Sequence, residues 1–451
     1  MLDILQKLGV VLQGYFNFVM GWPLIIYVLA ISLIYTVALS FVQFRYFFRA
    51  WKNMLFPKPS ETKLEKKSDV TPMQAFMNLL NANIGNGALA GVATAICSGG
   101  PGAALWYVIM GFILMAVRFA EVYASAHFSA LAPTGSRLGG PMLYLGKVPG
   151  GKILSWLYAV LCLLMGFAMA CMMQMNSVAL GLKEAWGVSP YIVAGVALIF
   201  VLYIVLGGAQ RVAKASELLV PFKIGLFLFA SIFMLAYNYH AIIPALKLIF
   251  TGAFSSVSVL GGVVGYTVTE AIRYGMMRTT MATESGLGTA SILFGSTGSK
   301  EPVDDAIMSM LSTFISAVFC FTTALCLVVS GVWNCGLKST DLVVSAYQTA
   351  FGSLSGALIV FLSTSFAAGV LVAYVYISRE AWIYVFKGRL IWLFGIVYSV
   401  AAAAGALVDV DLVWLLADIF VAGMLIINLY GLLYLLPVIR KAFKAFMLKN
   451  K

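Results

Sequence analysis

Charged residues and histidines are scarce in this sequence. Only 10% of the 451 residues are Asp, Glu, Lys or Arg, and the two histidines, His127 and His240, lie far apart. A soluble domain carries about 25% charged residues. The six cysteines show neither a Cys-x-x-Cys pair nor a Cys/His spacing typical of a metal site. The composition therefore argues against a soluble domain, and the sequence supports neither metal ligation nor redox chemistry.

Apolar residues, in contrast, dominate the chain. They make up 62% of it, and the mean hydropathy is +0.97, whereas roughly 45–50% is usual in soluble domains. Long apolar runs predict an all-α polytopic membrane protein with about eleven spans, the first at 21–44. The formal net charge of +12 does not indicate a nucleic-acid partner, because the basic residues are scattered between apolar runs. The expected surroundings are a lipid bilayer.

The distribution of the basic residues predicts the orientation, because cytoplasmic loops carry an excess of Lys and Arg. An N-terminus outside and a C-terminus in the cytoplasm satisfy this rule, and Lys223 then counts with the cytoplasmic set. Of the 29 Lys and Arg residues, this arrangement leaves outside only Lys7, Lys183, Lys247 and Lys338. We expect a multi-pass protein of the plasma membrane, which in bacteria is the inner membrane.

The spans divide into two groups of about five, which have opposite orientations because five is odd. We predict a first repeat at 71–240 and a second, inverted repeat at 241–437. One extra N-terminal helix and a basic cytoplasmic loop, 1–70, precede them, and a basic cytoplasmic tail, 438–451, follows. A monomer is expected, with an oligomer as the alternative.

The stretch Asn83-Ile84-Gly85-Asn86-Gly87-Ala88-Leu89-Ala90-Gly91 lies inside an apolar run that is long enough to cross a bilayer. Two Asn and three Gly within nine residues predict a broken helix, because Gly is about 1 kcal/mol worse than Ala in a helix. Broken backbone at membrane depth is tolerated where it lines a cavity, and its free amides and carbonyls can bind an anion and a cation. This stretch is therefore the first half of a predicted solute site.

The second group of spans contains a comparable stretch, Gly261-Gly262-Val263-Val264-Gly265. A matching pair of interrupted segments indicates a transporter's binding site. The alternative is close helix packing through small residues, since Gly261 and Gly265 have a GxxxG spacing. Gly262 and Gly265 are candidate site residues on the first interpretation.

Polar residues inside two other apolar runs allow two interpretations each. Gln174 either joins helices by a hydrogen bond or faces a polar cavity and meets a substrate ammonium. Ser363-Thr364-Ser365 either bonds back to its own helix or offers hydroxyl oxygens to a hard cation such as Na⁺.

Acidic residues lie near predicted cytoplasmic helix ends, where salt bridges and caps explain most of them. These residues are Glu121, Glu217, Glu270 and Glu284. The stretch Thr283–Thr289 is Gly-rich and is a candidate gate just inside the membrane. Asp418 and Asn428, in the last span, could equally have a structural role as a functional one.

The sequence contains no HExxH or GxSxG motif and no His near a candidate Cys or Ser. A membrane-embedded enzyme would need such a constellation, so we predict that the protein is not an enzyme and needs no cofactor. A passive channel would instead require a polar pore.

Several ordered motifs resemble the alanine or glycine:cation symporters, also called the sodium:alanine symporter family. Besides Asn83–Ile96, the motifs are Gly99-Gly100-Pro101-Gly102-Ala103, Gly139-Gly140-Pro141-Met142, Glu217-Leu218-Leu219-Val220-Pro221, Ala271-Ile272-Arg273-x-Gly275 and Glu284-x-Gly286-Leu287-Gly288. The resemblance implies a LeuT-type 5+5 inverted repeat preceded by one extra helix. It also implies Na⁺- or H⁺-coupled uptake of alanine, D or L, or of glycine.

The same resemblance implies roles for individual residues. Gly85, Asn86 and Gly87 would bind the substrate carboxylate through backbone amides, and Gln174 would approach the ammonium. The stretch from Gly262 to Gly265 would close the pocket. Na⁺ would be held by Asn83, Thr364 and Ser365, the first through nearby carbonyls.

The chain departs from the family pattern at two of these places. The family usually has Thr-Gly-Asn where this chain has Asn86-Gly87-Ala88, so a possible ligand is missing at position 88. Its usual Asn-Glu-Ala-Gly-Leu-Gly-Ser is here Thr283–Thr289. We therefore predict a secondary active transporter that brings a small neutral amino acid into the cell with a cation, Na⁺ first. The alternative is an H⁺-coupled or uncoupled carrier of another small amino acid or zwitterion.

Overall fold

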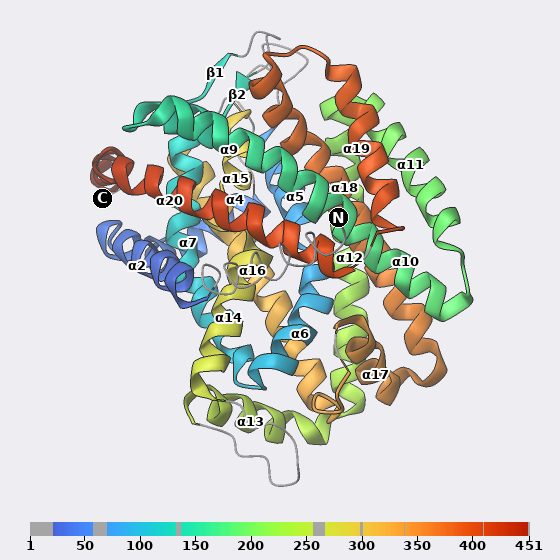
Figure 1. Cartoon of the computed structure of the whole chain (residues 1–451). Coiled ribbons are helices and arrows are strands. Elements are labelled where there is room, and N and C mark those ends of the chain that lie inside the picture. The colour runs from blue at the N-terminus through green and yellow to red at the C-terminus, as the bar shows by residue number, and fades with distance from the viewer. Residues whose placement is uncertain are drawn as a thin grey trace, which may run out of the picture.

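The structure is a computed structural model of the whole chain (Figure 1). It describes residues 21–56, 70–131, 137–255, 267–297, 301–337, 339–408 and 410–449. Helices account for nearly all of the regular structure. In the described ranges, one short antiparallel pair, β1 (Ala130–Leu131) with β2 (Arg137–Leu138), is the exception.

The helices of the first part of the chain are α2 (Trp22–Ala38), α3 (Val42–Arg45), α4 (Phe47–Leu55), α5 (Pro72–Asn83), α6 (Ala90–Gly99), α7 (Ala103–His127), α8 (Pro141–Tyr144), α9 (Gly151–Met165), α10 (Met173–Trp186), α11 (Pro190–Leu206), α12 (Gly208–Tyr237) and α13 (Ile242–Phe254). Those of the second part are α14 (Val268–Thr283), α15 (Thr289–Gly295), α16 (Pro302–Val329), α17 (Ser339–Phe351), α18 (Ser355–Phe386), α19 (Ile391–Gly405) and α20 (Val410–Lys449). A π-helical segment, η3 (Gly166–Met172), joins α9 to α10.

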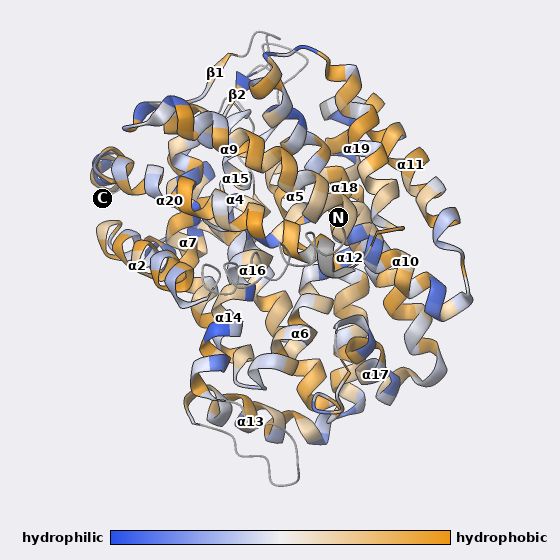
Figure 2. Ribbon diagram, viewed as in Figure 1, coloured by the Kyte–Doolittle hydropathy of each residue, from blue (hydrophilic) through white to orange (hydrophobic). Residues whose placement is uncertain are grey.

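Within the described residues, six helical stretches are long and apolar enough to cross a membrane: Ala103–His127, Gly151–Trp186, Gln210–Tyr237, Pro302–Val329, Ser339–Phe386 and Leu415–Lys449. Shorter apolar helices include α2, α11 and α19. Large apolar side chains are exposed along α11, where Ile192, Val196 and Ile199 are each more than half accessible, and Figure 2 shows α11 and α19 as mainly hydrophobic. An apolar outer surface of this extent fits lipid surroundings, in agreement with the expected multi-pass membrane protein.

Two of the helices begin with capping boxes. Thr71 accepts a hydrogen bond from the Gln74 amide at the start of α5, and Thr267 accepts one from the Glu270 amide at the start of α14; each partner side chain bonds back. This arrangement satisfies two otherwise free amides at each helix start. The prediction that caps explain some acidic residues is thus confirmed for Glu270.

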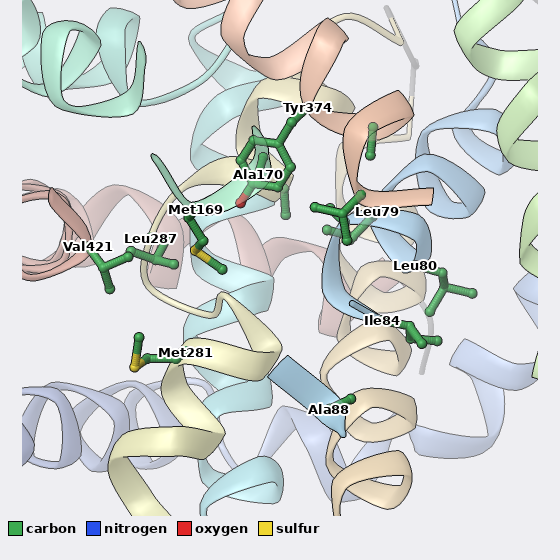
Figure 3. Close-up of a cluster of buried hydrophobic side chains, with 14 of the residues drawn as sticks. Leu79, Leu80, Ile84, Ala88, Met169, Ala170, Met281, Leu287, Tyr374 and Val421 are labelled. Carbon is green, nitrogen blue, oxygen red and sulfur yellow. The ribbon is translucent and has the colours of Figure 1, made fainter. Parts of the chain in front are cut away.

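The helix α7 packs along α16 in the centre of the molecule, and α5, α12 and α18 pack against one another beside them. A small-residue contact brings the first pair close, since a Cβ on Gly111 would lie 2.4 Å from Ala317 Cβ. Buried apolar side chains gather where α5 ends, including Leu79, Leu80 and Ile84 (Figure 3). The core of the protein therefore surrounds the interruption between α5 and α6.

Candidate functional site

The predicted interruption after Asn83 is present. Helix α5 ends at Asn83, one short 3₁₀ turn follows at Asn86–Ala88, and α6 starts at Ala90. Gly85 is extended, and a Cβ there would lie 2.6 Å from Val370 Cγ2. The backbone of the break thus passes too close to α18 for a side chain at this position.

Gln174 binds a backbone amide of this break. Its Oε1 atom accepts a hydrogen bond from Asn86 N at 3.1 Å, and its Nε2 atom donates to Met169 O at 3.5 Å. Gln174 lies two residues after the end of the π-helical segment η3 and is buried, at 1% exposure. Single-turn π segments frequently occur at functional sites. Both interpretations of Gln174 hold in part: it joins two segments, and it also lines the cavity at the break.

Three asparagines at this break have buried polar atoms that lack a hydrogen-bond partner within the described parts of the chain. They are Nδ2 and Oδ1 of Asn81 and Asn83, and Nδ2 of Asn86. Buried polar atoms are rarely left unpaired, because each lost partner costs about 1–3 kcal/mol. Such a group of unpaired atoms indicates a place where a polar ligand binds.

A cavity of about 30 Å³ lies at this point, between the break and helix α14. The first break contributes Asn83, Gly85 and Gly87, and Gln174 lies beside them. The remaining lining residues are Ala82, Gly91, Met169, Met173, Arg278, Met281, Ala282 and Glu284. The cavity thus joins three of the six residues expected to bind substrate, Gly85, Gly87 and Gln174; Asn86 is not in its lining, and Gly262 and Gly265 lie outside the described residues.

The backbone carbonyls at the end of α5 bind a different side chain, that of Lys223. The Lys223 ammonium, on α12, donates hydrogen bonds to Ile84 O at 2.7 Å and to Asn81 O at 3.1 Å. Lys223 is fully buried, although the charge pattern had counted it with the cytoplasmic loops. That assignment was wrong because helix α12 carries the residue into the protein interior.

A second broken helix lies between α14 and α15. The chain leaves helical geometry at Glu284, whose φ is +53°, and Gly286 and Gly288 also have positive φ values, +88° and +87°. Glycine adopts such values without strain, whereas other residues rarely do. The sequence analysis had interpreted this stretch as a gate and had placed the second interruption at Gly262 to Gly265, which lies outside the described residues.

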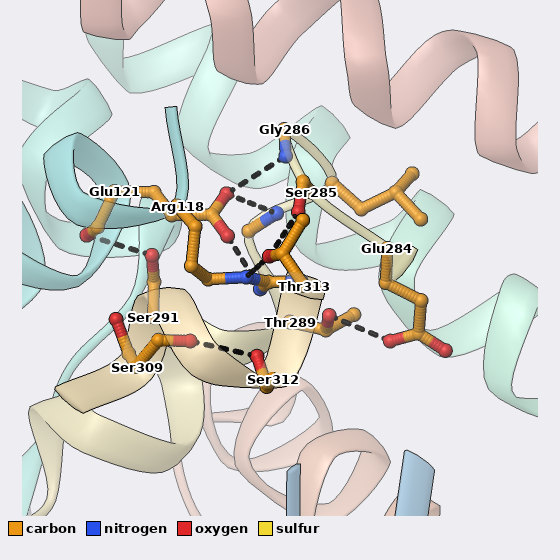
Figure 4. Close-up of polar contacts among 12 residues, drawn as sticks. Arg118, Glu121, Glu284, Ser285, Gly286, Thr289, Ser291, Ser309, Ser312 and Thr313 are labelled. Carbon is orange, nitrogen blue, oxygen red and sulfur yellow. Dashed lines mark hydrogen bonds and ion pairs between the residues drawn. The ribbon is translucent and has the colours of Figure 1, made fainter. Parts of the chain in front are cut away.

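Charged side chains from α7 hold this second break (Figure 4). One carboxylate oxygen of Glu121 accepts from Gly286 N at 3.2 Å and from Gly288 N at 3.1 Å. The other oxygen forms an ion pair of 2.5 Å with Arg118, which also donates to Thr283 O at the end of α14. Both charged side chains are fully buried. Glu121 is therefore no interfacial residue, in contrast to the expectation from its sequence position.

Glu284 connects the second break with the cavity. Its Oε1 atom accepts from the Tyr374 hydroxyl at 2.6 Å, and its Oε2 atom accepts from Thr289 Oγ1 at 2.7 Å. Glu284 lines the cavity together with Gly85 and Gly87. A buried carboxylate thus lies where the two broken helices meet.

The serine and threonine cluster on α18 is arranged as follows. Thr364 is exposed and donates to Val360 O at 2.8 Å, whereas Ser365 is buried and donates to Leu362 O at 2.7 Å. Both hydroxyls bond back to their own helix, as the first interpretation of this cluster predicts. Neither is among the residues that line the cavity.

Sequence reasoning missed the roles of Arg118, Glu121 and Lys223. The sequence did indicate the first two. Arg118 and Glu121 form an oppositely charged i, i+3 pair inside the apolar run of α7, and charged side chains inside a membrane span are energetically costly and usually functional. A lysine within the apolar part of α12 gives the same signal.

Comparisons with known proteins agree on one family. The sequence profile of the sodium:alanine symporter family matches residues 6–451. The sodium/alanine symporter AgcS of Methanococcus maripaludis is 34% identical over 443 residues, which cover 95% of each chain. An uncharacterized transporter of Haemophilus influenzae is 31% identical over 445 residues, 98% of this chain and 96% of its own.

The fold has a match among solved structures. A manganese transporter of Eremococcus coleocola superposes with a TM-score of 0.54 over 83% of this chain and 81% of that chain, at 12% sequence identity. At this identity the likeness concerns the fold alone.

Proposed function

The chain belongs to the sodium:alanine symporter family, and from that premise we propose that it carries a small neutral amino acid into the cell together with a cation by alternating access. The protein is a membrane transporter and not an enzyme. The observation that carries the proposal is the cavity that two broken helices share. Such paired breaks are where transporters bind substrates and coupling ions.

We propose the 5+5 inverted repeat as the architecture behind this cavity. In this proposal the eleven crossings are the six long apolar stretches, the shorter α2, α11 and α19, and the two broken helices. With α2 as the extra N-terminal helix, each half then opens with a broken helix, which supports the repeats at 71–240 and 241–437. Paired inverted repeats commonly place the solute at their interface.

The chemistry of the cavity supports a zwitterion. A free amino acid brings a carboxylate and an ammonium, and both must find partners because an unpaired charge is costly in an apolar interior. The amides of Gly85 and Gly87 suit the carboxylate, and the Asn86 amide would join them on exchanging its bond to Gln174 Oε1. Gln174 and Glu284 suit the ammonium. The second break closes the pocket here, at 284–288, in the role that Gly262 to Gly265 had in the sequence analysis.

The small volume of the cavity favours small substrates. The lining includes three glycines, Gly85, Gly87 and Gly91, and three methionines, Met169, Met173 and Met281. We therefore propose glycine, L-alanine and D-alanine as the substrates to test first. AgcS is named as a sodium/alanine symporter, which supports the same choice and makes Na⁺ the first candidate for the coupling ion, with H⁺ as the alternative.

The proposed setting is the plasma membrane, with the N-terminus outside and the C-terminus in the cytoplasm. In this orientation the membrane potential assists cation entry by about 2.3 kcal/mol per charge for each 100 mV. A monomer provides both broken helices and is therefore sufficient for the proposed cycle.

The test is uptake of labelled glycine, L-alanine and D-alanine into proteoliposomes. Accumulation above equilibrium under an inward Na⁺ gradient, and none without it, supports Na⁺ symport. Accumulation that follows an imposed proton gradient and is abolished by a protonophore supports H⁺ coupling. Flux of none of the three amino acids contradicts the proposed substrate class.

A further inference from the structure

The carbonyl end of helix α5 is the place where a transporter of this architecture would hold a cation. Helix α5 stops at Asn83, so its last carbonyls have no intrahelical amide partner and form the negative end of the helix. Unwound carbonyls and half-helix ends of this kind coordinate Na⁺ or H⁺. In this protein the carbonyls of Asn81 and Ile84 both accept hydrogen bonds from Lys223.

The ammonium of Lys223 also lies against α18, the helix that was expected to supply the other cation ligands. Its Nζ atom is 5.9 Å from the centre of the Phe366 ring. A Cβ on Gly369 would lie 2.6 Å from both Lys223 Nζ and Asn81 Oδ1. Because residues four apart share one face of a helix, Ser365 lies one turn from Gly369 on this face. The ammonium therefore stands between the break and the segment that carries Ser365.

No carboxylate pairs with this ammonium among the described residues. The comparison with the second break is informative, because there Arg118 bonds the last carbonyl of α14 and is neutralised by Glu121. Lys223 likewise binds carbonyls at the end of α5, but the oxygens that accept from its ammonium are neutral. An ammonium is a compact charge with three donors, and such a lone buried charge is stable only where the surroundings suit a cation.

We infer that the Lys223 ammonium takes the place of a bound metal cation at the end of α5, and that Lys223 thereby determines the ion preference of this position. The inference rests on the proposed function, which makes the first break the ion and substrate site. It deepens that function, because the position expected for Na⁺ near Asn83, Thr364 and Ser365 is filled by a charge that the chain itself carries. A Na⁺ ion that drives uptake binds elsewhere.

The experiment compares the thermal unfolding of purified variants in NaCl and in choline chloride at equal ionic strength. Lys223→Ala, Lys223→Met and Lys223→Gln remove the charge and free the carbonyls, whereas Lys223→Arg keeps the charge. Lys214→Ala, at an exposed position on the same helix, is the matched control. A ligand that binds only the folded state raises its stability in a saturable way.

The expected result is a saturable rise of several degrees in the unfolding midpoint with Na⁺ for the neutral variants. This rise should be absent or clearly smaller in the wild type, in Lys223→Arg and in Lys214→Ala. Neutral variants that can be purified only in NaCl would show the same gain of sodium dependence.

Two results would overturn the inference. One is a neutral variant that folds and responds to Na⁺ no more than the wild type. The other is failure of all neutral variants in both salts while Lys223→Arg folds, since Na⁺ then does not replace the ammonium. Uptake by the wild type is measured in parallel, so that failure of the proposed transport is recognised separately from failure of this assignment.

Discussion

Replacement of Glu121 by glutamine tests whether α7 holds the second break. The carboxylate pairs with Arg118 and accepts from two backbone amides, Gly286 N and Gly288 N. Glutamine has a similar shape but only one acceptor oxygen and no charge. It can serve the amides or Arg118, and whichever group is left keeps its desolvation cost.

The magnitude follows from the complete burial of the ion pair. Removing one partner of a buried pair costs roughly 3–5 kcal/mol, because the other charge is left without compensation. Native proteins are stable by only about 5–15 kcal/mol. The Glu121→Gln variant should therefore unfold at a clearly lower temperature and lose most of its transport.

Thermal unfolding of the purified variant and uptake in proteoliposomes measure this effect. Glu217→Gln is the matched control, because Glu217 is exposed on α12, and surface changes stay within about 0.5 kcal/mol. The double variant Arg118→Gln/Glu121→Gln removes both charges and should lose less than the two single losses added together. An unfolding midpoint of Glu121→Gln equal to that of Glu217→Gln would refute the assignment of Glu121 to this break.

Four further changes probe the two breaks and the cavity. Gly85→Ala should reduce uptake strongly, because the added methyl group meets α18 at 2.6 Å, whereas Gly87→Ala meets no atom within 4 Å and should fold normally. Since Gly87 lines the cavity, its variant should lower alanine uptake more than glycine uptake, which competition between the two labelled substrates would reveal. Gly288→Ala should lower the unfolding midpoint, because φ is +87° and a Cβ there would lie 2.3 Å from a proline ring. Tyr374→Phe removes the hydroxyl that donates to Glu284 at 2.6 Å and should raise the KM for substrate, with little change expected if Glu284 does not face the ligand.

Patterns that are local in sequence predicted much of this protein correctly. Apolar runs predicted a helical membrane protein, and the density of Asn and Gly after position 83 predicted the first break, which the structure contains. Gln174 was recognised as a polar residue at membrane depth, and it bonds Asn86 N. These features could be found because each depends on residue types within one helix or one turn.

The break at 284–288 was not predicted from the sequence, for a physical reason. The two glycines at 286–288 weaken a helix, but glycine content alone does not say that a stretch breaks within the membrane. The stretch at 286–288 is stabilised by a carboxylate on α7, far away in sequence, whose oxygen accepts hydrogen bonds from two of its amides, Gly286 N and Gly288 N. A break is stable in an apolar interior only if such partners satisfy the freed backbone groups, and this long-range pairing has no period in the sequence.

Lys223 shows most clearly that pairing between distant residues cannot be predicted from local sequence patterns. A lysine in a membrane protein is counted as a sign of the cytoplasmic side because lysine is costly inside the bilayer. That reasoning fails where the broken end of another helix offers two carbonyls to the ammonium, as Asn81 and Ile84 do here. The break and the buried lysine therefore stabilise each other. The freed carbonyls lower the free-energy cost of burying the ammonium, and the ammonium lowers the cost of leaving the carbonyls without helical partners. Neither feature is favourable alone, so a search for such sites must pair an interrupted helix with an intramembrane cation on a different helix.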